Sequence, residues 1–220
     1  MTGTINKRRS VLSIIYLLLL VTGCALDTYR MHPEFGTRAA SIKGPVLITP
    51  DVGMYELSSG GVVMLRDDWS RTGRKNLQNA ILGYFKDKRC KVKLIEMDSQ
   101  TAKEMEEVRA LYRLVHQTMD QHAFGHHQNR SNNHRFDFSI GSLEAILQKF
   151  DADAMIFVTG YDQVFKNGHK ALIDLAVADS SGNILYYSVK GTTKGEDIRD
   201  PVSTAALIHD LLSSFPRMEG

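Results

Sequence analysis

The apolar positions of the first half of the chain alternate between short runs and helical repeats. Residues 46–49 and 92–95 are short, branched apolar runs typical of buried strands. Between them, after Asp67-Asp68, apolar residues recur near helical spacing at Trp69, Leu77, Ile81 and Phe85. A strand, a helix and a strand of these lengths predict an early βαβ unit. Residues 56–64 predict a loop that ends in a short extended piece.

The middle of the chain predicts two further helices and a central strand. A helix is expected from Thr101, because apolar residues there recur at three and four positions. These residues are Met105, Val108, Tyr112, Val115 and Met119. A second helix is expected over residues 139–150, and residues 151–159 lead into the most apolar strand. This stretch should form the core of the domain.

The C-terminal part predicts a β-hairpin followed by a helix. Two β-rich runs, residues 171–177 and 184–189, flank the turn-forming residues 179–183. Asp200 and Pro201 then begin a helix, with proline at the favoured first position. The whole order predicts an α/β fold of three layers with a mixed sheet, parallel at first and antiparallel where the hairpin joins.

The N-terminal segment has the pattern of a targeting signal. Residues 1–10 carry three positive charges and no acid, and residues 11–21 form an apolar run. Eleven residues are too few for a bilayer core, which takes about 20. The next residues, Val21-Thr22-Gly23-Cys24, resemble the bacterial lipobox. The alternative is an uncleaved N-terminal helix with a buried cysteine.

The lipobox resemblance implies that Cys24 carries lipid, with fatty acids such as palmitate, after cleavage before this residue. Several acyl chains make a stable anchor. We therefore expect a signal peptide over residues 1–23, a lipidated tether over 24–43 and a single α/β domain over 44–216. Ala25 follows the cysteine in place of aspartate, which in the sorting rule of enteric bacteria favours the outer membrane, facing the periplasm.

Composition narrows the classes of function. Without residues 1–23, 197 of the 220 residues remain, and 43% of the whole chain is hydrophobic, enough for one folded domain. Removing the signal takes away Lys7, Arg8 and Arg9, so 24 basic residues face 25 acidic ones. A near-neutral domain gives no general electrostatic reason to bind nucleic acid. Nucleic acid is therefore not an expected partner.

No familiar catalytic motif stands in the chain. It lacks a Gly-x-Ser-x-Gly elbow, a Walker loop, a Gly-x-Gly-x-x-Gly turn and a His-Glu-x-x-His helix. The carboxylate pairs Asp67-Asp68 and Asp151/Asp153 could serve as acid and base, but a helix start and a strand start explain them better. With Cys24 lipidated, Cys90 has no disulfide partner and is expected to be a buried, inert thiol. We expect no catalytic residues.

The histidines are unusually clustered. Five of the eight lie within nineteen residues: His116, His122, His126, His127 and His134. Imidazole binds zinc, copper and nickel, so these are candidate metal ligands. Their spacing matches no ordered ligand motif, and the polar loop around them offers little to hold the rings. A weak or incidental surface cluster is the favoured interpretation, and no metal or other cofactor is expected.

Several of these features together resemble a known group. They are the lipobox, the strand at residues 46–49, the Asp-Ala-Asp-Ala entry to the strand at 151–154, and the Asp-Ser-Ser-Gly-Asn turn. In these features the chain resembles the bacterial outer-membrane lipoproteins with an anticodon-binding-like α/β domain, the group of CsgG, LpoB and PelC. The group's members bind or assemble with other envelope proteins and catalyse nothing. The long, histidine-rich insertion over residues 101–134 departs from the group, and the sequence shows no amphipathic pair of strands that would form a pore.

The function expected from the residues and this resemblance is structural. The protein should be a non-enzymatic, lipid-anchored periplasmic protein that acts by protein contact in envelope assembly, export or maintenance. Its partners should be the membrane, through Cys24, and other envelope proteins or copies of itself. The alternative is a periplasmic metal-binding or metal-dependent protein that uses the histidine-rich loop. The metal content of the purified domain separates the two.

Overall fold

An eight-stranded mixed sheet forms the centre of the computed structural model, which describes residues 29–95, 99–124, 136–166, 168–191 and 196–216, with backbone only for Ser99 and residues 122–124. The strands are β1 (Tyr29–Met31), β2 (Pro45–Leu47), β3 (Asp51–Leu57), β4 (Val63–Leu65), β5 (Lys93–Leu94), β6 (Ala154–Phe165), β7 (Gly168–Asp179) and β8 (Ile184–Gly191). The helices are α2 (Phe35–Ala39), α3 (Asp67–Asp87), α4 (Ser99–Phe124), α5 (Glu144–Lys149) and α6 (Pro201–Leu211).

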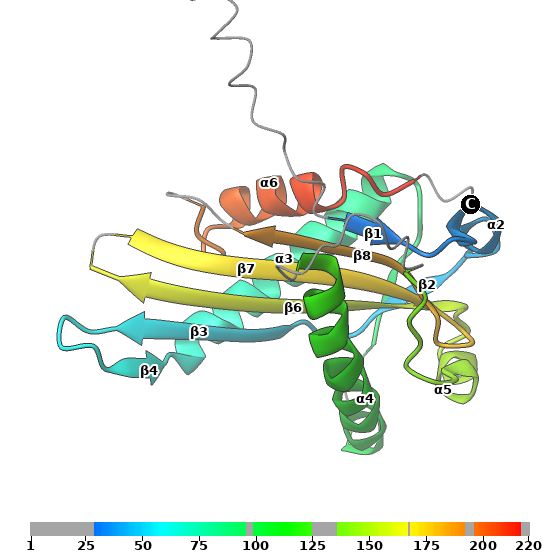
Figure 1. Cartoon of the computed structure of the whole chain (residues 1–220), viewed down its shortest axis with the longest axis horizontal. Helices are drawn as coiled ribbons and strands as arrows, with labels where there is room; N and C mark the ends of the chain where they lie inside the picture. The colour runs from blue at the N-terminus through cyan, green and yellow to red at the C-terminus, as the bar shows by residue number, and fades with distance from the viewer. Residues whose placement is uncertain (1–28, 96–98, 125–135, 167, 192–195, 217–220) are drawn as a thin grey trace, which may run out of the picture.

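The sheet is parallel on one side and antiparallel on the other (Figure 1). Its order is β1-β8-β7-β6-β2-β5, with β2 parallel to both β5 and β6 and the long strands β6, β7 and β8 antiparallel. Strand β3 continues where β2 ends and pairs in parallel with the distal half of β6, and β4 pairs antiparallel with β3. The distal parts of β3, β4, β6 and β7 therefore project together at one end of the sheet.

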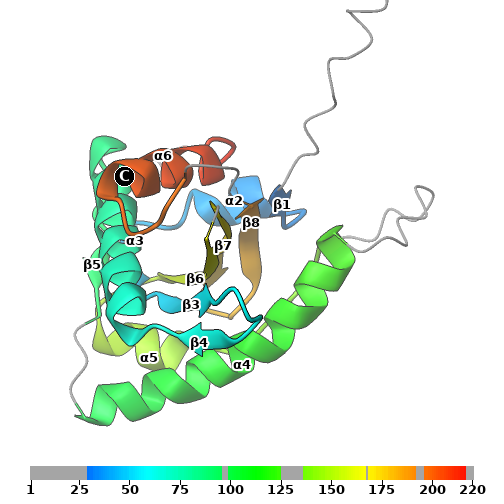
Figure 2. The same ribbon diagram turned by 90° about the vertical axis from the view of Figure 1, so that its left-hand side faces the viewer.

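Helices cover both faces of the sheet and make three layers (Figure 2). Helices α3 and α6 pack on one face over alternate residues of β6 and β7 that include Ile156, Val158 and Leu175. Helices α4 and α5 pack on the other face over the intervening residues, among them Phe157 and Ala176. Because side chains alternate along a strand, each face has its own apolar core. The predicted three-layer α/β fold with a mixed sheet is confirmed.

Particular elements also follow the prediction. Strands β2 and β5 are parallel and α3 lies between them in the chain, so the early βαβ unit is present. The hairpin of β7 and β8 turns at residues 179–183 and is followed by α6. Asp200 caps α6, since its Oδ2 accepts a hydrogen bond from the amide of Ser203 at 2.8 Å, and Pro201 is the first helical residue.

The structure corrects the prediction at two places: the N-terminus of the domain and the hairpin of β3 and β4. Residues 24–43 were expected to be a tether, but β1 and α2 lie within them, and Phe35 and Ala39 are buried in the core. The described fold thus begins at Tyr29 and not at residue 44. Strand β3 was also missed: the loop-like residues 58–62 form a turn, with Gly61 at φ 80°, that joins β3 to the short extended piece β4.

Candidate functional site

The predicted site residues fall mostly outside the described part of the chain. Cys24, His126, His127 and His134 lie there, so their predicted roles stay predictions. His122 lies in α4, but its side chain is not among those described. His116, also in α4, faces the sheet and is the one candidate ligand whose contacts are described. Within the described residues, no group of three or more His, Cys, Asp and Glu side chains is arranged to hold a metal ion.

The carboxylate pairs have structural contacts. Asp68 lies in the first turn of α3 and accepts hydrogen bonds from Arg66, which lower the pKa of Asp68. Asp153 accepts hydrogen bonds from the backbone amides of Lys43 and Gly44, at 2.7 and 3.1 Å, and so fixes the chain before β2. The thiol of Cys90 is buried, and burial together with the charge of Asp153 raises its pKa.

A cluster of polar side chains lies buried between α4 and the sheet. Its centre is Asp174 of β7, which is 3% exposed. Asp174 Oδ1 lies 3.1 Å from His116 Nε2 and accepts a hydrogen bond from Tyr112 Oη at 3.2 Å. Asp174 Oδ2 accepts from the hydroxyl of Thr159, directly across the strand pair. The hydroxyl oxygen of Tyr187, in β8, lies 3.1 Å from His116 Nε2. We call Asp174 and these four partners the α4 cluster.

The α4 cluster perturbs the proton equilibria of its members. Burial disfavours the charged imidazole of His116, but the hydrogen bond to Asp174 and its charge outweigh burial and raise the pKa of His116. Burial, and then the charge of Asp174, raise the pKa values of Tyr112 and Tyr187, so both phenols stay protonated. The hydroxyl of Tyr187 donates a hydrogen bond to Asp120, one turn along α4 from His116. One feature of the sequence indicates this site: Asp174 is an acidic residue within the apolar run at residues 171–178.

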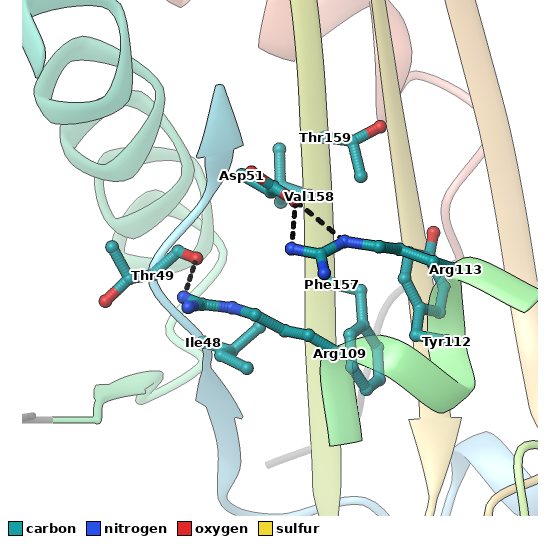
Figure 3. Close-up of a pocket in the computed structure, with 9 residues that line it drawn as sticks. All are labelled: Ile48, Thr49, Asp51, Arg109, Tyr112, Arg113, Phe157, Val158 and Thr159. Carbon is teal, nitrogen blue, oxygen red and sulfur yellow. Dashed lines mark hydrogen bonds and ion pairs between the residues drawn. The ribbon is translucent and has the colours of Figure 1, made fainter. Parts of the chain in front are cut away.

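A small pocket with two arginines adjoins the α4 cluster (Figure 3). It lies where the chain passes from β2 to β3 under α4, and its lining includes Tyr112 and Thr159 of the cluster. Arg109 donates a hydrogen bond to the carbonyl of Thr49 at 2.8 Å. Arg113 donates to Asp51 Oδ2 at 2.9 and 3.2 Å. The two guanidinium groups point in the same direction, toward the segment between the strands.

A second histidine and aspartate lie on the opposite face of the sheet. Asp162 of β6 is fully buried, and His169 Nδ1 of β7 lies 3.6 Å from its Oδ1. Neither carboxylate oxygen of Asp162 has a hydrogen-bond partner among the described residues. The guanidinium of Arg199, whose charge also acts on Asp162, donates a hydrogen bond from Nε to Asp197 at 2.9 Å. Burial raises the pKa of Asp162, while the charge of His169 partly opposes this.

The projecting end of the sheet exposes large apolar side chains. Seven of the ten such side chains in the described part of the chain gather here, each 41–60% exposed. They are Val62, Val63, Met64, Leu65, Tyr161, Phe165 and Leu172. Register places Leu65 beside Tyr55 on β3, and Tyr55 packs on Tyr161 with ring centres 5.1 Å apart. A groove of about 600 Å³, open to solvent, runs between Glu56, Trp69 and Phe165. We call these seven residues the apolar end.

Comparison with known proteins gives structural likeness alone. No family model matches the chain, and no curated protein sequence matches it significantly. A PelC dodecamer from Paraburkholderia phytofirmans is 10% identical with a TM-score of 0.41, over 87% of this chain and 96% of that one. The LpoB C-terminal domain from Salmonella enterica is 10% identical with a TM-score of 0.30, over 75% and 96%. Lipoprotein GNA1162 from Neisseria meningitidis is 12% identical with a TM-score of 0.35, over 79% and 99%.

These solved structures include two members of the group that the sequence resembles, PelC and LpoB, and a further lipoprotein. With TM-scores below 0.5, the likeness does not place the chain in that group and carries no argument about its function. None of the described helices is long and apolar enough to cross a membrane.

Proposed function

We propose that this protein is anchored to the periplasmic face of the outer membrane by lipid on Cys24 and acts without catalysis, by contact with other envelope proteins. Its role would lie in assembly, export or maintenance of the envelope. Two features support the proposal. The N-terminal residues have the pattern of a lipoprotein signal, and the apolar end of the domain offers a surface suited to another protein.

The distance between the anchor and the domain is short. Four residues, 25–28, separate Cys24 from β1. A fully extended chain of this length spans roughly 18 Å at most, at about 3.6 Å per residue. The lipid would therefore hold the domain against the membrane, with the edge of the sheet at β1 closest to it. A partner would have to lie near the same membrane.

The apolar end lies away from the strand that continues from the anchor. Tyr29 of β1 pairs with Ser188, which stands beside Leu175 and then Val158 across the sheet. From Val158 to the tip of β6 at Phe165 there are seven residues, which is roughly 23 Å at about 3.3 Å per residue. A surface that lies this far along the sheet from the anchored strand suits a protein partner better than the anchoring bilayer.

The partner expected at the apolar end is an extended apolar segment. Strand β4 pairs only with β3 among the described residues, so its outer backbone edge can accept another strand. Val63 and Leu65 project to one side of that edge and Met64 to the other. Backbone hydrogen bonds would give affinity, and contacts with the apolar side chains on both sides would select the segment.

Photo-crosslinking in the native cell tests the contact. A crosslinking residue at Val63 should give one discrete adduct with an envelope protein or a second copy, and Tyr161→Asp should remove this adduct. The same residue at Val202, which is 76% exposed on α6, is the matched control and should give none. The proposal of a contact surface is wrong if Val63 and Val202 give the same pattern.

The anchor needs a test of its own. Cys24→Ser should leave an unprocessed precursor, because a hydroxyl does not replace the thiolate as lipid acceptor. Normal-size, membrane-bound mature protein from this variant would contradict lipidation at Cys24 but leave the contact surface untouched. Measurable turnover of a small substrate by the purified chain would contradict the non-enzymatic role.

A further inference from the structure

The passage from β2 to β3 leaves two backbone carbonyls outside the sheet. Leu47 pairs with Ile156, and Asp51 pairs with Thr159, so four residues of this chain span three of β6. The extra residue, with Pro50, turns the backbone away from its neighbour. The carbonyl of Thr49 accepts from Arg109 of α4 at 2.8 Å, and that of Pro50 accepts from Arg74 of α3 at 3.1 Å.

The arginines around this segment are unevenly paired. Arg113 holds both nearby carboxylates, Asp51 at 2.9 Å and Glu106 at 2.9 Å. Among the described residues, Arg109 has one hydrogen bond, to a neutral carbonyl, and its distance to Glu106 is 3.9 Å, beyond hydrogen-bond range. A guanidinium carries five N–H donors. Most donors of Arg109 therefore have no protein acceptor among the described residues.

The surroundings of Arg109 disfavour its charge. Its side chain is 22% exposed, and burial lowers the pKa of Arg109 although Asp51 and Glu106 oppose the change. The charges of Arg113 and Arg74 lower it further. Three arginines thus face two acids around this segment. An anion at Arg109 would relieve this imbalance, since charge-assisted bonds to a guanidinium are strong and directional.

The pocket in front of the arginines has room for a small group (Figure 3). Its empty volume is about 250 Å³ including the open mouth, and its enclosed bottom has room for roughly one oxygen atom. Ile48, Phe157 and Val158 contribute apolar walls. The pocket therefore fits the oxygen of a larger molecule and excludes a whole cofactor.

From this geometry we infer that Arg109, with Arg113 beside it, binds an oxyanionic group of a ligand or partner, a phosphate or carboxylate whose oxygen enters the pocket between β2, β3 and α4. The site goes beyond the proposed contact at the apolar end and does not depend on it. Because α4 also covers the α4 cluster, an anion bound at Arg109 would hold the middle of α4 to the sheet.

Titration calorimetry on the full chain in nonionic detergent tests the site, with chloride at constant ionic strength as background. Inorganic phosphate and acetate are the soluble probes, and vesicles of phosphatidylcholine with and without phosphatidylglycerol are the lipid probe. We expect saturable binding to at least one oxyanion. Arg109→Gln should weaken it roughly tenfold or more, since each 1.4 kcal/mol is about a factor of ten. Arg109→Lys should weaken it less.

Arg71→Gln is the matched control, because Arg71 is an exposed arginine of α3 away from the pocket, and it should leave binding unchanged. Binding of phosphate or acetate would assign a soluble or protein-borne anion, whereas Arg109-dependent binding to anionic vesicles alone would assign a lipid headgroup. If Arg109→Gln fails to fold, the lysine variant decides. The site is overturned if no probe binds saturably. It is also overturned if the wild type, Arg109→Lys and the control Arg71→Gln bind equally well.

Discussion

Two histidine–aspartate pairs lie on opposite faces of the same two strands, and they differ in how their carboxylates are satisfied. Asp174 of the α4 cluster receives hydrogen bonds from Tyr112 and Thr159 and contacts His116 at 3.1 Å. Asp162 faces α3 and α6, lies 3.6 Å from His169 and has no hydrogen-bond donor among the described residues. One pair joins a helix to the sheet, and the other leaves a buried carboxyl unsatisfied.

This difference shows that burial alone does not determine what an acid contributes. A buried charge costs several kcal/mol unless donors compensate it. Tyr112 and His116 both project from α4 toward Asp174, so the same contacts that satisfy the acid also hold the helix. On the other face, the guanidinium of Arg199 acts on Asp162 by its charge but donates its hydrogen bonds to Asp197. Asp162 should therefore weaken the fold, whereas Asp174 should stabilise it.

The largest effect is expected for Asp174→Ala. This change leaves Tyr112, His116 and Thr159 without their common acceptor in a buried place. Removing one partner of a buried network costs about 3–5 kcal/mol in the free energy of unfolding. Urea denaturation measures this loss. Asp210→Ala is the control, because Asp210 is exposed and pairs with Lys190 at the surface, so its effect should stay within about 0.5 kcal/mol. Equal effects of the two changes would remove the contrast between the pairs.

The next largest effect concerns His116. We expect His116→Gln to cost about 1–3 kcal/mol at pH 6, because the charged imidazole is the strongest donor near Asp174. The pKa of His116 is raised in the fold, so its contribution is fully present below the unfolded value of 6.5 and is lost as pH rises through the folded pKa. Asp174, Asp120, Tyr112 and Tyr187 are the groups that face it.

The measurement for His116 is the free energy of unfolding from pH 6 to pH 9. The wild type should lose stability across this window, and His116→Gln should show a flatter profile. His209→Gln is a control on α6, where the imidazole packs on Tyr84 away from the α4 cluster. If both histidine variants keep the wild-type slope, the α4 cluster does not set the pH dependence.

The layers and most elements of the fold could be predicted from sequence because their signals are local. The spacing of Leu77, Ile81 and Phe85 places one face of α3 on the sheet, and the cap at Asp200 fixes the start of α6. Strand β3 was missed because its exposed side and the glycine-rich turn after it hide the alternation. The sequence of the segment with β1 and α2 predicts a tether, because the residues that bury Phe35 and Ala39 lie far from them in the chain.

The candidate sites were less predictable, because each site brings together residues that lie far apart in the sequence. His116 was noticed, but as one of five clustered histidines and not as a partner of Asp174, 58 residues further along the chain. The helical spacing predicts Tyr112 as an apolar core residue, but its hydroxyl also donates a hydrogen bond to Asp174. Arg109 and Arg113 resemble ordinary charges on the polar side of a helix. Their place at the β2–β3 passage depends on how α4 crosses the sheet, which no local pattern encodes.

A smaller effect of opposite sign is expected for Asp162→Asn. Asp162 is buried without a donor among the described residues, which disfavours its charged form at pH 7, so a neutral amide of the same shape should raise the free energy of unfolding by about 1 kcal/mol. The pKa of Asp162 is raised in the fold, so its favourable contribution is present below the unfolded value of 3.8 and is lost as pH rises. The advantage of the variant should therefore shrink from pH 7 to pH 4 in denaturation curves. A loss of more than 1 kcal/mol at pH 7 would mean that Asp162 is satisfied as well as Asp174.

An effect of about the same size is expected for Tyr187→Phe, compared with Tyr186→Phe on the neighbouring position of β8. The two hydroxyls serve opposite faces: Tyr186 donates to the carbonyl of Leu211 in α6 at 3.0 Å, and Tyr187 lies 3.1 Å from His116 in α4. Each change removes one hydroxyl and keeps the ring, so each should cost about 0.5–1.5 kcal/mol in urea denaturation. Only Tyr187→Phe should also move the titration of His116, followed by the chemical shifts of its ring protons, because that hydroxyl contacts the imidazole directly. If Tyr186→Phe moves this titration as much as Tyr187→Phe does, the two faces of the sheet are coupled through β8, and the contrast between the two histidine–aspartate pairs is not a property of separate faces.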